Sequence, residues 1–303
     1  MSPPSDAASS PGCAEPASTR RRGALLDRTL PPLPPATQST TYRLSLPADY
    51  TPSVAAPLLV SMHGWGMGLD DSNDLHRYGI NQGFIVASPL GYDEGNMYSS
   101  WNGAGTTHVT RATDSADGGD GSGTSCLIFD ANRFEPLCYP SCGNCSDFPC
   151  SWTTCYDSVA QVVQLLDVLL DALCVDVSRV FATGESNGGI FLYELARDAR
   201  TASRFAGFIP VIGSPHANVA AAPLVVPAPF LALRGRFDTT VPPGNGSSDV
   251  ALDSDQPGVV AWRFRSADQV AHAWTNANGC RGDAARLAPP PGAHAAKQAP
   301  WTG

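Results

Sequence analysis

Short apolar runs alternate with stretches of helical periodicity along the middle of the chain. Uninterrupted or alternating runs predict strands, and apolar residues that recur every three or four positions predict helices. The predicted strands are 41–46, 57–62, 83–88, 179–183, 208–212 and 230–233, and the predicted helices are 157–174, 187–197 and 260–276. Strands that alternate with helices imply a mostly parallel sheet covered on both faces, so the predicted fold class is α/β.

Three regions fall outside this pattern. Residues 1–38 are rich in Pro, Ser and Ala, and we expect them to be disordered because they cannot bury enough apolar surface. Residues 104–155 are rich in Gly, Asp, Thr and Cys, which is typical of a surface insertion. We therefore expect an α/β domain over 39–280 that carries this Cys-rich insert, followed by an irregular tail at 281–303.

Length and charge narrow the choice of partners. The 303 residues suit one large domain with a buried core. A net charge of −9 argues against a nucleic-acid partner, because a polyanion would be repelled. No apolar run is long enough to predict a membrane span. We expect a monomer that acts on a small or polymeric substrate.

Cysteine usage indicates an oxidising compartment. The chain has nine cysteines, and six of them lie between Cys126 and Cys155. Disulfides are the favoured interpretation, although the spacings of Cys138, Cys142, Cys145 and Cys150 would also suit zinc. Two glycosylation sequons, at Asn144 and Asn245, also fit a secreted protein. The N-terminal residues contain no apolar signal-peptide segment.

A candidate nucleophile lies between a predicted strand and a predicted helix. Residues 184–188 read Gly-Glu-Ser-Asn-Gly, the G-x-S-x-G pattern, with Ser186 at its centre. A serine on such a sharp turn requires small residues two positions before and after it. The alternative is a Gly-Ser-Gly turn that only joins a strand to a helix, but the strand and helix around the motif favour a nucleophile.

Two main-chain N–H groups are candidates for an oxyanion hole. The first belongs to Asn187, at the start of the predicted helix. The second belongs to Trp65, which follows His63 and Gly64 directly after a buried strand. The Trp65 side chain could instead serve only as a pocket wall. We expect His63 to brace this loop and not to act as the catalytic base.

The acid and base of a catalytic triad should follow the nucleophile in the chain. Asp238 lies in the loop after the predicted strand 230–233, where a carboxylate would orient a histidine. The candidate bases after it are His272, which falls inside a predicted helix, and His294, which follows a run of prolines. Neither position suits a base that must contact a serine, so we expect the catalytic histidine to be missing from a truncated C-terminus.

The chain resembles the feruloyl esterase and polyhydroxybutyrate depolymerase-like group of α/β-hydrolases over about residues 41–280. The matching segments are His63-Gly64-Trp65, Trp101-Asn102, 156–159, the turn at 180–189, the loop 235–243, Trp274 and Asn278-Gly279-Cys280. The resemblance implies an α/β-hydrolase fold, Ser186 as nucleophile, Asp238 as triad acid, and Asn187 with Trp65 as oxyanion donors. It also implies that Cys280 lacks its disulfide partner.

These observations predict a serine carboxylic-ester hydrolase that works through an acyl-enzyme. The expected substrates are feruloyl or acetyl esters of polysaccharides, or short polyesters, and the Cys-rich insert would shape access to them. No metal or cofactor is expected. Because the base is not evident, the alternative is a catalytically inactive α/β-hydrolase-fold protein that binds a ligand, and a peptidase is a weaker third possibility.

Overall fold

A computed structural model describes residues 8–13, 23–95, 97–110, 125–129, 132, 136–146, 148–217, 219, 226–244 and 260–280 of the chain. Its strands are β1 (Leu25–Leu30), β2 (Thr40–Ser45), β3 (Ala56–Met62), β4 (Ile85–Pro89), β5 (Cys126–Ile128), β6 (Val175–Glu185), β7 (Gly207–Val211) and β8 (Val260–Trp262). Its helices are α1 (Asn73–Asn81), α2 (Ser158–Ala172), α3 (Asn187–Arg197) and α4 (Ala267–Ala277).

The main sheet has six strands in the order β1-β2-β4-β3-β6-β7. The four strands from β4 to β7 run parallel, whereas β1 and β2 are antiparallel to their neighbours. Parallel bridges from Phe208 to Phe230 and from Val211 to Leu233 continue the sheet beyond β7. The predicted strand 230–233 therefore lies where it was expected, although only isolated bridges form there.

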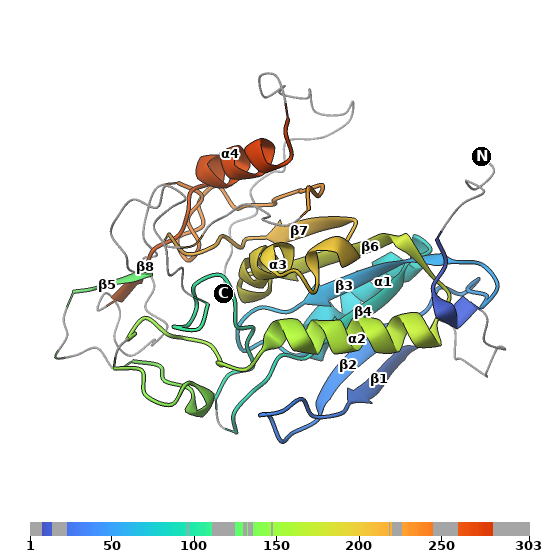
Figure 1. Ribbon diagram of the computed structural model, residues 1–303, viewed down its shortest axis with the longest axis horizontal. Coiled ribbons are helices and arrows are strands. Elements are labelled where there is room, and N and C mark those ends of the chain that lie inside the picture. Colours follow the sequence, from blue (N-terminus) through green and yellow to red (C-terminus); the bar gives the residue numbers. More distant parts are fainter. Residues whose placement is uncertain are drawn as a thin grey trace, which may run out of the picture.

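Helices cover both faces of this sheet, as the sequence predicted. The chain moves in one direction across the sheet from β3 to β4 and in the other direction from β4 to β6 and on to β7. Because such crossovers are right-handed, α1 lies on one face, and α2 and α3 lie on the other (Figure 1). The apolar face of α2 predicted from valine and leucine spacing is buried, with Val162, Leu166 and Leu169 at most 1% exposed.

The expectation that residues 1–38 are disordered is wrong for the parts that the structure describes. A disulfide joins Cys13 to Cys174, and the Ser10 hydroxyl donates to the carbonyl of Leu173 at 2.5 Å. Residues 25–30 form β1, which pairs with β2 along its whole length. Composition could not predict either feature, because the disulfide depends on a partner far away in the sequence and β1 depends on its pairing with β2.

The predicted helix 260–276 is also wrong at its beginning. Residues 260–262 form β8, which pairs with β5 in the insert. The helix begins only after Ser266, whose side chain accepts a hydrogen bond from the main-chain N–H of Gln269, while the Gln269 side chain accepts one from the N–H of Ser266. This reciprocal cap fixes the start of α4 and leaves the preceding apolar residues free to form a strand.

The cysteines of the insert are paired as disulfides. The bonds are Cys126–Cys150, Cys138–Cys145 and Cys142–Cys155. All four cysteines of the alternative zinc interpretation are therefore engaged, and the prediction of disulfides is confirmed. Cys280 is free and exposed. Within the described residues, no helix combines the length and the apolar content that a membrane span needs.

Candidate active site

Ser186 lies on a sharp turn between β6 and α3. Its backbone has φ 50° and ψ −114°, a region that residues with a side chain rarely adopt. The main-chain N–H of Ser186 donates to the carbonyl of Val211 at 2.9 Å, and the N–H of Ile190 donates to the carbonyl of Ser186 at 2.8 Å. These two bonds hold the strained backbone in place, and the side chain is partly exposed.

The glycines of the motif are required by close backbone contacts. A Cβ atom on Gly184 would lie 2.5 Å from the carbonyl carbon of Gly188. A Cβ atom on Gly188 would lie 2.3 Å from the carbonyl oxygen of Met62, at the end of β3. Both distances are far below van der Waals contact. The structure thus contains the tight strand-to-helix turn that the sequence predicted around Ser186.

Asn187 connects this turn to the loop that follows β4. Its side chain is fully buried, accepts a hydrogen bond from the N–H of Trp101 at 2.8 Å and donates to the carbonyl of Trp101 at 3.0 Å. This clamp was not predicted, because nothing in the sequence indicates that residues 101 and 187 meet. The main-chain N–H of Asn187 has no hydrogen-bond partner among the described residues, so it is available to a ligand near Ser186.

The loop after β3 passes close to Ser186. A Cβ atom on Gly64 would lie 3.5 Å from the Cβ atom of Ser186. His63 braces this loop, since its Nε2 accepts from the N–H of Gly91 at 2.9 Å and its Nδ1 bonds the carbonyl of Gly64 at 2.6 Å. Burial lowers the pKa of His63 below its ordinary value. A neutral histidine that is bonded at both nitrogens acts as a brace, as we expected.

Trp65 was expected to act either as an oxyanion donor, through its main-chain N–H, or as a pocket wall, through its side chain. Its ring packs against Tyr98 at 4.2 Å between centroids, and its Nε1–H donates to the Tyr139 hydroxyl at 3.0 Å. The side chain is therefore held between Tyr98 and Tyr139 in the loop whose Gly64 approaches Ser186. The main-chain N–H of Trp65 has no partner among the described residues. Both candidate oxyanion donors are thus unpaired near the same serine.

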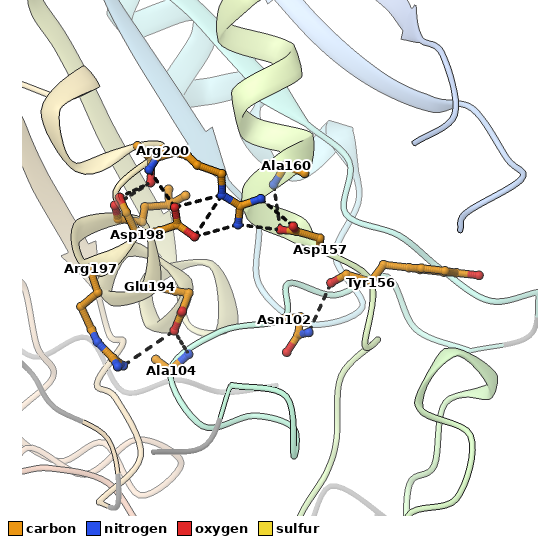
Figure 2. A network of polar contacts seen from close by, with 11 residues as sticks. Asn102, Ala104, Tyr156, Asp157, Ala160, Glu194, Arg197, Asp198 and Arg200 are labelled. Carbon is orange, nitrogen blue, oxygen red and sulfur yellow. Dashed lines mark hydrogen bonds and ion pairs between the residues drawn. The ribbon is translucent and has the colours of Figure 1, made fainter. Parts of the chain in front are cut away.

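A polar network ties the base of the insert to α2 and α3 (Figure 2). Asp157 accepts from the N–H of Ala160 at 2.9 Å, which caps α2, and pairs with Arg200 at 2.6 Å. Glu194, on α3, accepts from the N–H of Ala104 at 3.0 Å. Helix α3 carries Ser186 at its start, so this network fixes the position of the insert relative to the candidate nucleophile.

Asp238 lies at the same edge of the sheet as Ser186. Ser186 follows β6, while Asp238 follows the segment 230–233 on the far side of β7. Two strand spacings are about 10 Å, which leaves room for an imidazole between the two side chains. One oxygen of Asp238, Oδ1, accepts from the N–H groups of Thr240 and Val241, each at 2.9 Å. Its Oδ2 has no partner among the described residues.

The described histidines do not supply a base. His76 bonds the hydroxyls of Ser45 and Ser88 at 2.6 and 2.9 Å. His216 accepts from the Nε1–H of Trp152 at 3.0 Å and bonds the carbonyl of Arg263 at 2.9 Å. Burial lowers the pKa of His76 and of His216 to about 4.

Two further described histidines, His272 and His108, are also unsuited to act as the base. His272 is exposed on α4, as expected for a residue on the surface of a helix. His108 lies 3.9 Å from the sulfur of Cys155, which belongs to a disulfide. His294 lies outside the described residues. In the part of the chain that the structure describes, the site thus has a serine, a carboxylate and two N–H groups.

Comparisons with known proteins give only distant matches. No family model and no curated protein matches the chain. Among solved structures, it is similar to a thermostable esterase (TM-score 0.47, 16% identity, covering 84% of this chain and 52% of that one). It is also similar to a putative dienelactone hydrolase from Klebsiella pneumoniae (TM-score 0.42, 15% identity, covering 84% of this chain and 82% of that one). A third similar structure is esterase 2 of Thermogutta terrifontis (TM-score 0.44, 12% identity, covering 74% of this chain and 75% of that one).

The chain spans about half the length of the thermostable esterase that it matches. Sequence identities this low bear on the fold alone. The class of the protein follows from its own architecture. A mostly parallel sheet with helices on both faces, and a serine on a strained turn between a strand and a helix, define an α/β-hydrolase fold.

Proposed function

We propose that this chain is a serine ester hydrolase with Ser186 as its nucleophile. One observation carries the proposal: Ser186 has a backbone φ of 50° on a tight turn, and the main-chain N–H groups of Asn187, next to it, and of Trp65, in the loop that approaches it, have no partners among the described residues. Such groups stabilise the negative charge that develops on a carbonyl oxygen during acyl transfer. A structural turn alone would not need this strain.

The proposed reaction has two steps. The Ser186 oxygen attacks the ester carbonyl, its proton passes to a histidine, and the N–H groups of Asn187 and Trp65 bind the oxyanion. The alcohol then leaves with the proton from that histidine. Water, activated by the same histidine, attacks the acyl-enzyme and releases the acid. Asp238 would accept a hydrogen bond from the histidine through its free Oδ2.

The base in this proposal comes from outside the described residues. His294 is the candidate within the sequence, because the described histidines are bonded elsewhere or lie on the surface of α4. Its role can be tested without knowledge of its position. If His294 is the base, His294→Ala will lower the rate of hydrolysis about as strongly as loss of the serine.

The proposed substrates are feruloyl or acetyl esters of polysaccharides, or short polyesters. The resemblance to feruloyl esterases and polyhydroxybutyrate depolymerases supports this class. The aromatic pair Trp65 and Tyr98, in and beside the loop that approaches the serine, would offer an apolar surface to the acyl group. Four disulfides fit a protein that works in an oxidising, extracellular environment.

The test is hydrolysis of p-nitrophenyl acetate, p-nitrophenyl butyrate and methyl ferulate by the full chain. We expect release of product from at least one ester, and no release above background from Ser186→Ala with an unchanged melting temperature. Equal rates for the two proteins would contradict the proposal. Preference among the three esters would identify the acyl group.

A second candidate function is ligand binding without catalysis. The observation that favours it is the set of described histidines, none of which is free to act on Ser186. A fluorophosphonate probe separates the two candidates, since only an activated serine reacts quickly. A pocket that only binds would leave the probe unreacted over hours, whereas the hydrolase would be labelled within minutes.

A further inference from the structure

One hydroxyl of the Cys-rich insert joins the two chain segments that flank the candidate oxyanion hole. The Tyr139 oxygen accepts a hydrogen bond from the Nε1–H of Trp65 at 3.0 Å. The same hydroxyl donates to the carbonyl of Tyr98 at 2.7 Å. Trp65 follows β3 and Tyr98 follows β4, so Tyr139 contacts two loops at the edge of the sheet where Ser186 lies.

Tyr139 is held rigidly within the insert. Its side chain is fully buried, and burial raises its pKa to about 12, so it remains a phenol that can donate and accept. Cys138, directly before it, and Cys142, three residues after it, form disulfides with Cys145 and Cys155. The insert thus presents this hydroxyl in a fixed position.

A second contact fixes the same turn of the insert. Ser141, two residues beyond Tyr139, donates its main-chain N–H to Glu94 at 2.6 Å, and its hydroxyl also bonds Glu94. Thr154 donates to Glu94 at 2.7 Å. Because Glu94 belongs to the loop after β4, loss of the Tyr139 hydroxyl alone would leave the insert attached to the domain.

The loop that carries the Trp65 N–H is braced by His63 and is also bonded directly to the segment 98–99. The N–H of Gly66 donates to the carbonyl of Ser99 at 2.9 Å, and the Ser99 hydroxyl donates to the carbonyl of Met67 at 2.8 Å. Both bonds lead to the segment 98–99, which is the segment that Tyr139 holds. The Tyr139 hydroxyl adds a third hydrogen-bonded link between these two segments, and this link holds the side chain of Trp65.

We propose that Tyr139 is a positioning residue for the oxyanion hole, and that the Cys-rich insert contributes to catalysis through it. By bonding Trp65 and Tyr98 at once, the hydroxyl restrains the loop that carries the Trp65 N–H and whose Gly64 approaches Ser186. The inference rests on the proposed function, because it assigns a role in the same reaction. It gives the insert a task beyond shaping access to the site.

The variant Tyr139→Phe tests this role, because it keeps the ring and removes only the hydroxyl. When an oxyanion donor is displaced by a fraction of an ångström, its stabilisation of the transition state decreases, whereas binding of the ester in the ground state changes little. We expect kcat for p-nitrophenyl acetate to fall about 10- to 100-fold while KM changes less than about threefold. A residue that only stabilises the fold would leave kcat of the folded protein unchanged.

The matched control is Tyr50→Phe. Tyr50 is also a buried tyrosine, and its hydroxyl accepts from the main-chain N–H of Cys174 at 2.8 Å, away from the candidate site. Loss of this hydroxyl removes a comparable hydrogen bond. We expect kcat and KM of Tyr50→Phe to match those of the wild type, even if its melting temperature falls.

Trp65→Phe provides a second variant in case Tyr139→Phe does not fold. It removes the donor of the same hydrogen bond and keeps the main-chain N–H. On its own, Trp65→Phe should lower kcat about as much as expected for Tyr139→Phe, about 10- to 100-fold. Where both single variants fold, the double variant should lose little more activity than either of them, because the two side chains act through one contact. Losses that multiply in the double variant would contradict the proposal.

Amide hydrogen exchange gives a readout that does not depend on catalysis. We expect the segment 64–67 to exchange about tenfold faster in Tyr139→Phe than in the wild type, with β3 unchanged. Unchanged exchange in this segment would overturn the inference, whether or not the wild type hydrolyses esters. A wild type that shows neither hydrolysis nor fluorophosphonate labelling would overturn the proposed function instead. Faster exchange with unchanged kcat would overturn the catalytic role of Tyr139.

Discussion

The turn at Ser186 and the loop 235–243, which carries Asp238, are built by different physical means. At the turn, no side chain fits on Gly184, which faces the main chain of Gly188, or on Gly188, which faces the main chain of Met62 at the end of β3. By contrast, the loop 235–243 leaves room for additional side-chain atoms. A Cβ atom on Gly235 would lie 3.4 Å from that of Asp238, an ordinary contact, and Phe237 is 72% exposed.

This difference shows what determines the position of Ser186 and of Asp238. Ser186 is placed by steric exclusion, which tolerates almost no change in the surrounding backbone. Asp238 is placed by the end of a strand and by the two N–H groups that its own carboxylate binds. We therefore expect added side chains at the turn glycines to damage folding, and substitution of Asp238 in the loop to affect chemistry alone.

The largest expected effect is the loss of the serine hydroxyl. Ser186→Ala should lower kcat/KM for p-nitrophenyl acetate at least about 10⁴-fold, because no other group can form the acyl-enzyme. The melting temperature should change little, since the hydroxyl makes no hydrogen bond within the described residues. Steady-state kinetics and thermal unfolding of the same preparation measure both. Residual activity within tenfold of the wild type would exclude Ser186 as the nucleophile.

Asp238→Asn should have the next largest effect. The amide oxygen can still accept from Thr240 and Val241, but the negative charge that would stabilise a protonated histidine is lost. We expect kcat to fall roughly 10²- to 10⁴-fold with unchanged stability. Asp171→Asn, at an exposed position on α2, is the control and should retain full activity. Equal activity of the two variants would show that Asp238 only shapes the loop.

A pair of glycine substitutions compares the two regions directly. Gly188→Ala places a methyl group within 2.3 Å of the Met62 carbonyl oxygen, so we expect a loss of about 3–5 kcal/mol in the free energy of unfolding, or no folded protein. Gly235→Ala meets only an ordinary contact and should cost less than about 1 kcal/mol. Urea unfolding of both variants measures the difference. Similar costs at the two positions would refute the contrast drawn above.

The smallest expected effect concerns acid stability and lies outside both regions. Burial lowers the pKa of His76 and His216 to about 4, whereas an unfolded histidine has a pKa of about 6.5. The unfolded chain therefore binds more protons between these values. The stabilising contribution is complete above pH 6.5 and is lost as the pH falls towards 4. We expect the free energy of unfolding to be about 2–4 kcal/mol lower at pH 5 than at pH 7.5.

Substitution of one buried histidine checks the source of this pH dependence. His216→Asn should reduce the difference in the free energy of unfolding between pH 5 and pH 7.5, even though the variant is less stable overall. His272→Gln, on the exposed face of α4, should leave the difference unchanged. If His216→Asn retained the full difference, other groups would have to cause it.

Local patterns predicted most of the sheet and the nucleophile turn. The apolar runs at 57–62 and 208–212 correspond to β3 and β7, and the predicted helix 187–197 matches α3. These features depend on neighbouring residues, so the sequence contains the necessary information. The glycines around Ser186 could be interpreted for the same reason, because the contacts that exclude side chains follow from the strand-to-helix turn itself.

Features that depend on distant partners could not be predicted. The disulfide between Cys13 and Cys174 orders part of a segment whose composition indicates disorder. Residues 260–262 have helical periodicity but pair with β5. The Tyr139 hydroxyl is 74 residues from Trp65 in the chain, so no local pattern could reveal that they meet. Each of these contacts is set by tertiary structure, which overrides local propensity.

The central claim is that Ser186 is an activated nucleophile, and covalent labelling tests it most directly. The full chain would be treated with a fluorophosphonate, and the adduct located by mass spectrometry of its peptides. The account predicts one adduct, on Ser186, formed within minutes and absent from heat-denatured protein. Absence of an adduct on the native protein, or an adduct on another residue, would contradict it.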